Sequence, residues 1–389
     1  MTTIKYQNMK NQTAVISILV DALGWELVKE YKFLSCVTPF KTGLTTVLGF
    51  SSSAVPTVLA GISGDKMELW NSAYYSPETS PYKWLNWFKW VPDIFKENRY
   101  SRFIIRHFSR RLARHKGYFS DFAIPVKYLP QFDLCEKRNI YAIGGLIGKQ
   151  SIFDDLDRLG EPCKIYSYVE YANDDKIFTQ ARQDISKADS RIFYLYLCQL
   201  DAYLHEHVLE KDKVKQMVKW YETKITDLFT HAKKNYRKVV LHVFSDHGMV
   251  PTISTVELIK TINTLGFSEG KDFAAMYDST MARFWFMSDD CKKAILQILE
   301  SLDCGDIVSD QTLKDEGAFF KDRRFGETIF LMKPGMLICP SYMSYTPVQG
   351  MHGYSPKDRF MEASYLSNVV PKNAPQHIID IKKTIIQTI

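Results

Sequence analysis

Lys238 to Val250 reads K-V-V-L-H-V-F-S-D-H-G-M-V, and this stretch decides the fold. Its apolar run, residues 239–244, is β-branched and aromatic and too short for an ordinary helix, so it predicts a buried strand of an α/β sheet. The run stops just before Asp246 and His247, which are side chains that can bind a metal ion. Taken alone, this pair also fits a turn-forming aspartate followed by an exposed histidine.

Two other strand-like runs end in the same kind of residue. Residues 13–20 (T-A-V-I-S-I-L-V) end on Asp21, and residues 191–197 (R-I-F-Y-L-Y-L) are followed by Asp201 and His205. Parallel strands bring their carboxyl ends to one edge of the sheet, where ligands bind. Asp201 and His205 are four residues apart, so on one helical turn both can face one ion. The ordinary alternative for Asp21 is a cap on the following helix.

Small polar residues precede a predicted helix in L-G-F-S-S-S-A-V-P-T-V-L-A-G, residues 48–61. The helix is expected to begin near residues 53–56, where its start would direct backbone N–H groups at an anion. A hydroxyl on this turn would be held against the bound group, which makes Ser51 the predicted nucleophile. The alternatives are a serine-rich cap without chemistry and a metal-independent serine hydrolase, although the run lacks the second glycine of a G-x-S-x-G elbow.

The C-terminal third adds one more predicted ligand. In G-M-H-G-Y, residues 350–354, glycines flank His352 and permit a close approach of the backbone, although a turn histidine is the alternative. Strand-like runs at residues 281–286 and 328–332 alternate with helix-like runs, which extends the α/β pattern.

Length and composition set outer limits on the class of protein. The 389 residues are 46% hydrophobic, which is ample for a large core. The N-terminus M-T-T-I-K-Y-Q-N-M-K lacks the apolar core of a secretory signal, and no stretch reaches the roughly 18 apolar residues of a membrane span, so we expect a cytoplasmic protein. Seven cysteines without a C-x-x-C pair argue against a disulfide framework or a thiolate metal site. The net charge of +6 favours an anionic substrate but is too mild to predict specific nucleic-acid binding, and the oligomeric state stays open.

Together, these residues resemble the alkaline phosphatase superfamily, in its type I phosphodiesterase and nucleotide pyrophosphatase branch. V-D-A-L-G-W around Asp21 resembles the first metal-binding aspartate of that family, D-A-Y-L-H its D-x-x-G-H element, S-D-H-G-M its paired ligands and G-M-H-G-Y its last histidine. Ser51 lies ten residues before Gly61, as the nucleophile does in the family. Leu204 stands where the family has a glycine, and Ser51 where nucleotide pyrophosphatases usually have a threonine.

The resemblance implies an alkaline-phosphatase-like sandwich, with a mostly parallel sheet between helices, formed by residues 1–61 and 141–389. It also implies a metal-dependent hydrolase of anionic phosphate esters, most simply a phosphodiesterase or pyrophosphatase acting through a Ser51 phosphoenzyme. Asn71 is the expected donor to a phosphate oxygen. Two divalent ions, zinc first and manganese as the alternative, would be held by Asp21, Asp246, His247 and Ser51 on one side and by Asp201, His205 and His352 on the other.

Residues 62–140 are aromatic and basic and are predicted to be a cap subdomain inserted into this core. Within them, residues 99–116 predict an amphipathic helix with a cationic face, because arginines recur at every fourth position from Arg102 to Arg114. We expect the arginines and tryptophans of the cap to select the leaving portion of the substrate. The alternatives are a solvated face and a peripheral contact with an anionic membrane.

Other activities stay open at this point. Within the same superfamily they are a phosphomonoesterase, a sulfatase, or a phosphotransferase acting on a lipid- or glycan-linked phosphodiester. The run S-S-S-A-V lacks the C/S-x-P-S-R pattern of sulfatases. A catalytically inactive binding protein is the alternative from another class, but all seven expected ligand positions are filled.

Overall fold

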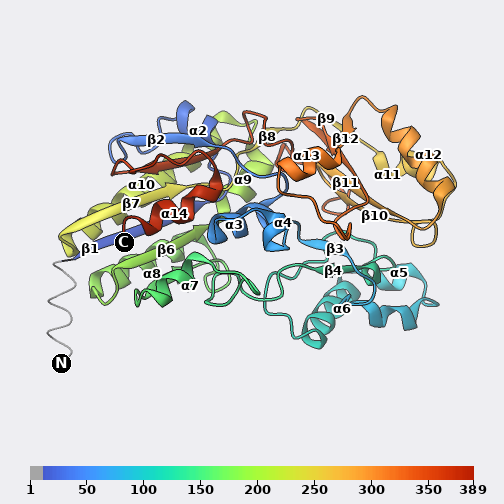
Figure 1. The fold of residues 1–389 in the computed structure, drawn as a ribbon, viewed down its shortest axis with the longest axis horizontal. Coiled ribbons are helices and arrows are strands. Elements are labelled where there is room, and N and C mark those ends of the chain that lie inside the picture. The colour runs from blue at the N-terminus through green and yellow to red at the C-terminus, as the bar shows by residue number, and fades with distance from the viewer. Residues whose placement is uncertain (1–11) are drawn as a thin grey trace.

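The computed structural model describes residues 12–389, so the predicted features of residues 1–11 lie outside the described residues (Figure 1). Within the described range, six strands form a central sheet in the order β2 (Phe40–Leu44), β16 (Ala363–Ser367), β7 (Lys238–Phe244), β1 (Thr13–Val20), β6 (Ile192–Leu197) and β5 (Cys163–Tyr166). Strands β7, β1, β6 and β5 are parallel to one another, whereas β16 runs antiparallel to both of its neighbours. The predicted mostly parallel α/β sheet is therefore confirmed. The three strands that precede predicted ligands, β7, β1 and β6, lie side by side.

The central sheet is buried on both faces. In β1, Ile16 and Ile18 belong to one hydrophobic cluster and Val15 and Leu19 to another, because successive side chains of a strand point to opposite faces. Helices on the first face are α2 (Trp25–Glu30), α8 (Asp174–Lys187), α9 (Gln199–His207) and α10 (Lys211–Asn235). Helices on the second face are α3 (Ser51–Ala60), α4 (Gly64–Met67), α7 (Ile152–Arg158), η3 (Ile378–Asp380) and α14 (Ile381–Ile386). This arrangement is the expected sandwich.

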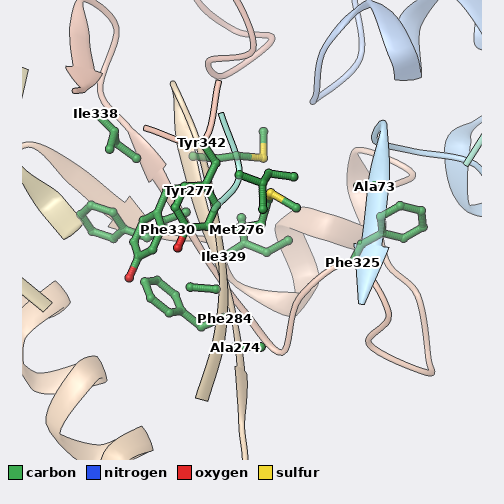
Figure 2. Packing of buried hydrophobic residues seen from close by; sticks show 14 of the residues in the cluster. Ala73, Ala274, Met276, Tyr277, Phe284, Phe325, Ile329, Phe330, Ile338 and Tyr342 are labelled. Atoms are coloured by element: carbon green, nitrogen blue, oxygen red, sulfur yellow. The ribbon is translucent and has the colours of Figure 1, made fainter. Parts of the chain in front are cut away.

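The two later strand runs are strands, as expected, but they lie outside the central sheet. They form a separate antiparallel sheet in the order β10 (Phe273–Asp278), β11 (Met281–Phe286), β13 (Thr328–Met332) and β12 (Gly305–Ile307). Helices α11 (Leu258–Asn263), α12 (Asp289–Glu300) and α13 (Asp310–Asp315) contribute to the same hydrophobic cluster. Figure 2 shows how Tyr277, Phe284 and Phe330 pack inside it.

The predicted cap, residues 62–140, packs against this second sheet. Its elements are β3 (Ala73–Tyr75), η1 (Lys83–Phe88), α5 (Asp93–Lys96), α6 (Arg99–Leu112), η2 (Leu129–Gln131) and β4 (Phe132–Leu134). Trp70, Tyr82 and Phe132 are buried in one cluster with residues of β10 and β11. The segment thus shares its core with the second sheet, and the domain boundaries at 62 and 140 stay predictions.

Short two-strand pairs complete the described chain. They are β9 (Ser254–Val256) with β14 (Met336–Ile338) and β8 (Val250–Pro251) with β15 (Gly350–Met351). No helix between residues 12 and 389 is long and apolar enough to cross a membrane.

Candidate active site

The carboxyl ends of three adjacent strands bring the first ligands together. Val20 at the end of β1 pairs with Leu197 at the end of β6, and Leu19 pairs with Phe244 at the end of β7. Asp21 follows β1 directly, and Asp246 and His247 follow β7 after one residue, so all three reach the same edge of the sheet. All three side chains are buried, and His247 Nε2 lies 3.3 Å from a carboxylate oxygen of each aspartate.

Local sequence explains how the chain leaves this edge. Gly248 lets the backbone pass beside Phe360, because a Cβ atom there would lie 2.1 Å from the Phe360 carbonyl oxygen. The His247 Nδ1 atom donates to the Gly248 carbonyl over 2.9 Å. Since a carbonyl only accepts, the Nδ1 atom carries the proton and Nε2 keeps a lone pair for a metal ion or a donor.

Helix α9 supplies the second pair. Asp201 and His205 lie on successive turns of the helix and line the same cavity as Asp21. His205 Nε2 is 3.3 Å from Asp201 Oδ2. His205 Nδ1 donates to the Gly350 carbonyl over 2.8 Å. Leu204, where the family has a glycine, is fully buried in the helical layer on the first face of the sheet. This departure therefore affects the packing of α9 rather than the ligand positions.

His352 reaches the same place from the loop after β15. Its ring stacks on His247 with centroids 3.8 Å apart, and its Nε2 lies 3.5 Å from Asp201 Oδ1. Gly353 has φ of +90°, and a Cβ atom there would lie 2.6 Å from the Phe50 ring. Glycine thus permits the close packing of this loop on the start of α3.

Helix α3 begins at Ser51, two residues before the predicted start. The Ser51 hydroxyl lies 2.9 Å from His247 Nε2 and is positioned to donate to it. The backbone amides of residues 53 and 54 donate to the Phe50 carbonyl, whereas those of Ser51 and Ser52 have no such partner among the described residues, and both serines line the cavity. The structure therefore brings all seven predicted ligand residues to one location.

The buried aspartate and histidine side chains of this cluster have shifted pKa values. Burial raises the pKa of Asp21 well above its usual value, and the charges of Asp246 and Asp201 raise it further. Burial and the Asp201 charge raise the pKa of Asp246 to about 7. Burial opposes ionisation of Asp201 too, but His205 and His352 lower its pKa below the usual value. Burial lowers the pKa of His205, but Asp201 overcomes this and raises it to about 9. A bound cation would stabilise all three carboxylates as anions.

Unpaired polar atoms test whether these residues fit metal ions. Within residues 12–389, four buried atoms of the cluster have no hydrogen-bond partner: Asp21 Oδ1, Asp201 Oδ1, Asp246 Oδ2 and His352 Nδ1. Ligand atoms of Asp201, His205 and His352 lie within 4.8 Å of one another, and so do those of Asp21, Asp201 and His247. Orphaned oxygen and nitrogen donors in two overlapping groups fit divalent ions such as zinc.

Asn71 lies in the wall of the same cavity. Its side-chain oxygen accepts from the Ser72 amide over 2.6 Å, and its Nδ2 lies 3.5 Å from Asp278 Oδ2. Asp278 is held in turn by Arg283, whose Nε donates over 2.8 Å. Asn71 is buried, so its amide is fixed beside the ligand cluster.

The rest of the cavity wall was not predicted. The cavity of 360 Å³ is lined largely by aromatic rings, among them Tyr118, Phe122 and Tyr168, together with the Glu136 carboxyl group. Among the described residues, no lysine or arginine lines it, so the prediction that cap arginines select the substrate was wrong for this cavity. Tyr196 was also missed, although its hydroxyl donates to Asp21 Oδ2. A tyrosine inside a fully buried strand usually has a partner for its hydroxyl, and that signal was present in the sequence.

Comparisons with known proteins give a family and a fold. A family model described as type I phosphodiesterase / nucleotide pyrophosphatase matches residues 123–355, more than half of the chain. The match includes Asp201, Asp246 and His352 but not Asp21 or Ser51. No curated protein sequence matches significantly.

Three similar solved structures show the fold. Murine ectonucleotide pyrophosphatase / phosphodiesterase 5 is 12% identical with a TM-score of 0.65, covering 96% of this chain and 94% of that one. Its human counterpart is also 12% identical with a TM-score of 0.64, covering 96% and 94%. An inactive form of the murine protein in complex with AMP is 13% identical with a TM-score of 0.63, covering 97% and 94%.

Proposed function

Because the chain belongs to the type I phosphodiesterase / nucleotide pyrophosphatase family, we propose that it is a metal-dependent hydrolase of phosphate esters, acting as a phosphodiesterase or pyrophosphatase with Ser51 as its nucleophile. One observation supports this most directly. The Ser51 hydroxyl lies 2.9 Å from His247 Nε2, at the start of a helix and inside a cluster of buried aspartate and histidine side chains. A structural serine cap would not need that cluster around it.

Two divalent ions, when bound, would supply positive charge to the phosphoryl oxygens and to the Ser51 oxygen. We assign zinc as the first candidate and manganese as the alternative, because the donors are oxygen and nitrogen. The Cys198 thiol lines the same cavity but is not a proposed ligand. Burial raises its pKa to about 12, so it stays protonated at neutral pH. The proposed ligands are Asp21, Asp246, His247 and Ser51 for one ion and Asp201, His205 and His352 for the other.

The residues of the chain account for the two steps of hydrolysis. Ser51 Oγ attacks phosphorus, and the bond from phosphorus to the leaving oxygen breaks as a phosphoserine forms. The leaving oxygen takes up the proton that Ser51 gives up. Water then attacks phosphorus, the bond from phosphorus to Ser51 Oγ breaks, and Ser51 takes up a proton from that water. We assign the first-turn amides of α3 and the Asn71 Nδ2 atom as donors to the phosphoryl oxygens, because Ser51, Ser52 and Asn71 line the same cavity.

The cavity favours an aromatic or apolar leaving group. Tyr118 and Tyr168 meet edge to face with ring centroids 6.4 Å apart, and both line the wall beside the ligand cluster. Such rings can stack on a base or cover another flat group. The complex of the murine relative with AMP makes nucleotides the first substrates to test.

A substrate panel tests the proposal. The purified chain is incubated with dinucleoside polyphosphates, a chromogenic phosphodiester and a chromogenic phosphomonoester, with zinc, with manganese and with chelator. We expect diester or pyrophosphate cleavage that requires metal and disappears in Ser51→Ala. Cleavage of the monoester alone would assign a phosphomonoesterase instead. Chelator-resistant turnover would overturn the metal-dependent mechanism.

A further inference from the structure

Large hydrophobic side chains are exposed along residues 87–112, the segment that precedes Tyr118 and Phe122 of the cavity wall. Trp87 is 81% exposed, Trp90 and Ile94 are each 78% exposed, and Ile104 is 63% exposed. We call this surface the outer patch, and its members are Trp87, Phe88, Trp90, Ile94, Phe95, Tyr100, Phe103, Ile104, Phe108 and Leu112. Large hydrophobics are far sparser elsewhere on the surface of residues 12–389, so this concentration marks an interaction site.

Helix α6 exposes apolar side chains as well as the expected cationic ones, Arg106, Arg110 and Arg111. Phe103, Ile104 and Phe108 are exposed, whereas Ile105 and Ser109 are buried. Tyr100, Ile104, Phe108 and Leu112 follow one another at every fourth position and are all exposed, so they form a continuous stripe along one side of the helix.

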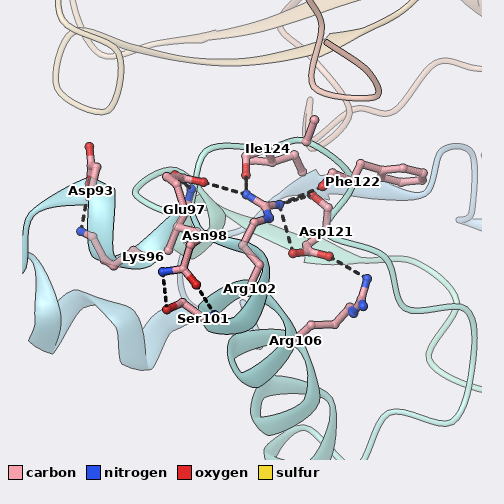
Figure 3. A network of polar contacts seen from close by, with 12 residues as sticks. Asp93, Lys96, Glu97, Asn98, Ser101, Arg102, Arg106, Asp121, Phe122 and Ile124 are labelled. Carbon is pink, nitrogen blue, oxygen red and sulfur yellow. Dashed lines mark hydrogen bonds and ion pairs between the residues drawn. The ribbon is translucent and has the colours of Figure 1, made fainter. Parts of the chain in front are cut away.

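Polar contacts fix this orientation. The Arg102 side chain points inward, where it donates to Glu97, to Asp121 and to the carbonyls of Phe122 and Ile124 (Figure 3). The Arg102 side chain is only 17% exposed and Asp121 only 4%. Turning the apolar stripe inward would break this buried network, so the exposed stripe belongs to the native packing.

Basic residues accompany the apolar ones. Residues 83–116 contain ten lysines and arginines and two acidic residues, a net charge of +8, whereas the whole chain has +6. The positive charge of the chain therefore comes from this segment. Within residues 12–389, Lys89, Arg99, Arg111 and Arg114 are exposed and have no ion-pair partner. Free cations beside exposed tryptophans and aliphatic residues are the composition of a helix that lies in a membrane interface.

We propose that the outer patch docks on a bilayer that contains anionic lipids, with α6 lying along the surface. A second copy of the chain would have to bring two segments of charge +8 together, which disfavours self-association through this patch. Tyr118 and Phe122 of the cavity wall lie within ten residues of the end of α6, and Arg102 donates to the Phe122 carbonyl, which links the helix to that wall. Docking would thus hold the cavity close to the headgroup layer. The proposal concerns binding only and does not depend on the proposed chemistry.

Vesicle co-sedimentation of the full chain tests this proposal. The vesicles contain phosphatidylcholine alone or mixed with phosphatidylglycerol. One variant combines Trp90→Ser with Ile104→Asn, and a second combines Arg99→Gln with Arg111→Gln. The control is Ile253→Asn, because Ile253 is 80% exposed but lies outside the outer patch. Circular dichroism and thermal unfolding report that each variant is folded.

We expect wild-type protein to bind the mixed vesicles and to be released by high salt. The apolar variant should bind at least about tenfold more weakly, and each removed arginine should weaken binding by about fivefold. Ile253→Asn should bind as wild type does. Equal binding by wild type and the apolar variant, or no binding to mixed vesicles, would overturn the proposal. A concentration-dependent dimer that the apolar variant abolishes would assign the patch to self-association instead.

Discussion

Tyr196→Phe removes one hydroxyl and nothing else from the proposed metal site. This hydroxyl donates to Asp21 Oδ2 from the neighbouring strand, and both side chains are buried. The bond holds the carboxylate so that its other oxygen, which has no partner in the described chain, faces His247. Without the hydroxyl, Asp21 is free to rotate and a metal ion must order it on binding.

The expected loss follows from the strength of a hydrogen bond to a charged group. Such a bond contributes about 1.5–3 kcal/mol, which corresponds to roughly 10–100-fold in metal affinity. The same range is found when the supporting partners of metal ligands are removed. Turnover at saturating metal should fall much less than affinity, because Tyr196 would not touch the phosphate.

A matched control lies two residues away on the same strand. The Tyr194 hydroxyl is buried and has no hydrogen-bond partner among the described residues. Tyr194→Phe should therefore leave metal affinity unchanged and leave stability equal or slightly higher. Metal affinity is measured by competition with a chromogenic chelator. If the two variants bind metal with affinities within twofold of each other, the Tyr196 hydroxyl does not support the site and the reasoning fails.

Three further outcomes follow from other contacts. Ser51→Ala should lower turnover by at least about a thousandfold while metal content stays the same, whereas Ser52→Ala should keep most activity; the reverse would move the nucleophile by one residue. Burial raises the pKa of Glu136 to about 7, so this group stabilises the fold fully below its unfolded pKa near 4.5 and loses that contribution as pH rises through 7. Urea unfolding at pH 5 and pH 8 should show a smaller pH dependence for Glu136→Gln, by up to about 3 kcal/mol. Arg102→Met should destabilise the chain by about 3 kcal/mol, whereas Arg106→Gln, which removes a half-exposed pair of 3.5 Å, should change stability by under about 1 kcal/mol in the same assay.

The sequence predicted where Asp21, Asp201 and Asp246 lie, because each follows a strand that local signals identify. The runs that end at Asp21, before Asp201 and before Asp246 are short, apolar and β-branched or aromatic, and strands of that kind lie in the interior of parallel sheets. Once three such strands are adjacent, their carboxyl ends must meet. The roles of these residues, the identity of the metal and the cytoplasmic location stay predictions.

Other features of the structure depend on contacts between residues far apart in the sequence, which local patterns do not predict. The run at 281–286 looks like any buried strand, and only its pairing with residues 273–278 and 328–331 places it in a second sheet. The predicted helix at 99–116 ends at Leu112, so Arg114 lies beyond it, and His115 is buried against Phe119. The inward turn of Arg102 depends on Asp121, nineteen residues away, which no helical periodicity reports.

The central position of β1 affects how this strand can pair while the chain is being synthesised. Its two neighbours in the sheet begin at residues 192 and 238, so β1 leaves the ribosome long before either partner exists. At the usual pace of synthesis of about 5–20 residues per second, the wait is on the order of ten to forty seconds. Throughout that interval, an eight-residue strand that is almost wholly buried in the finished protein has nothing to pair with. The nascent chain should therefore be a substrate for chaperones that shield apolar segments, and the proposed metal ligands come together only after the loop with His352 has emerged.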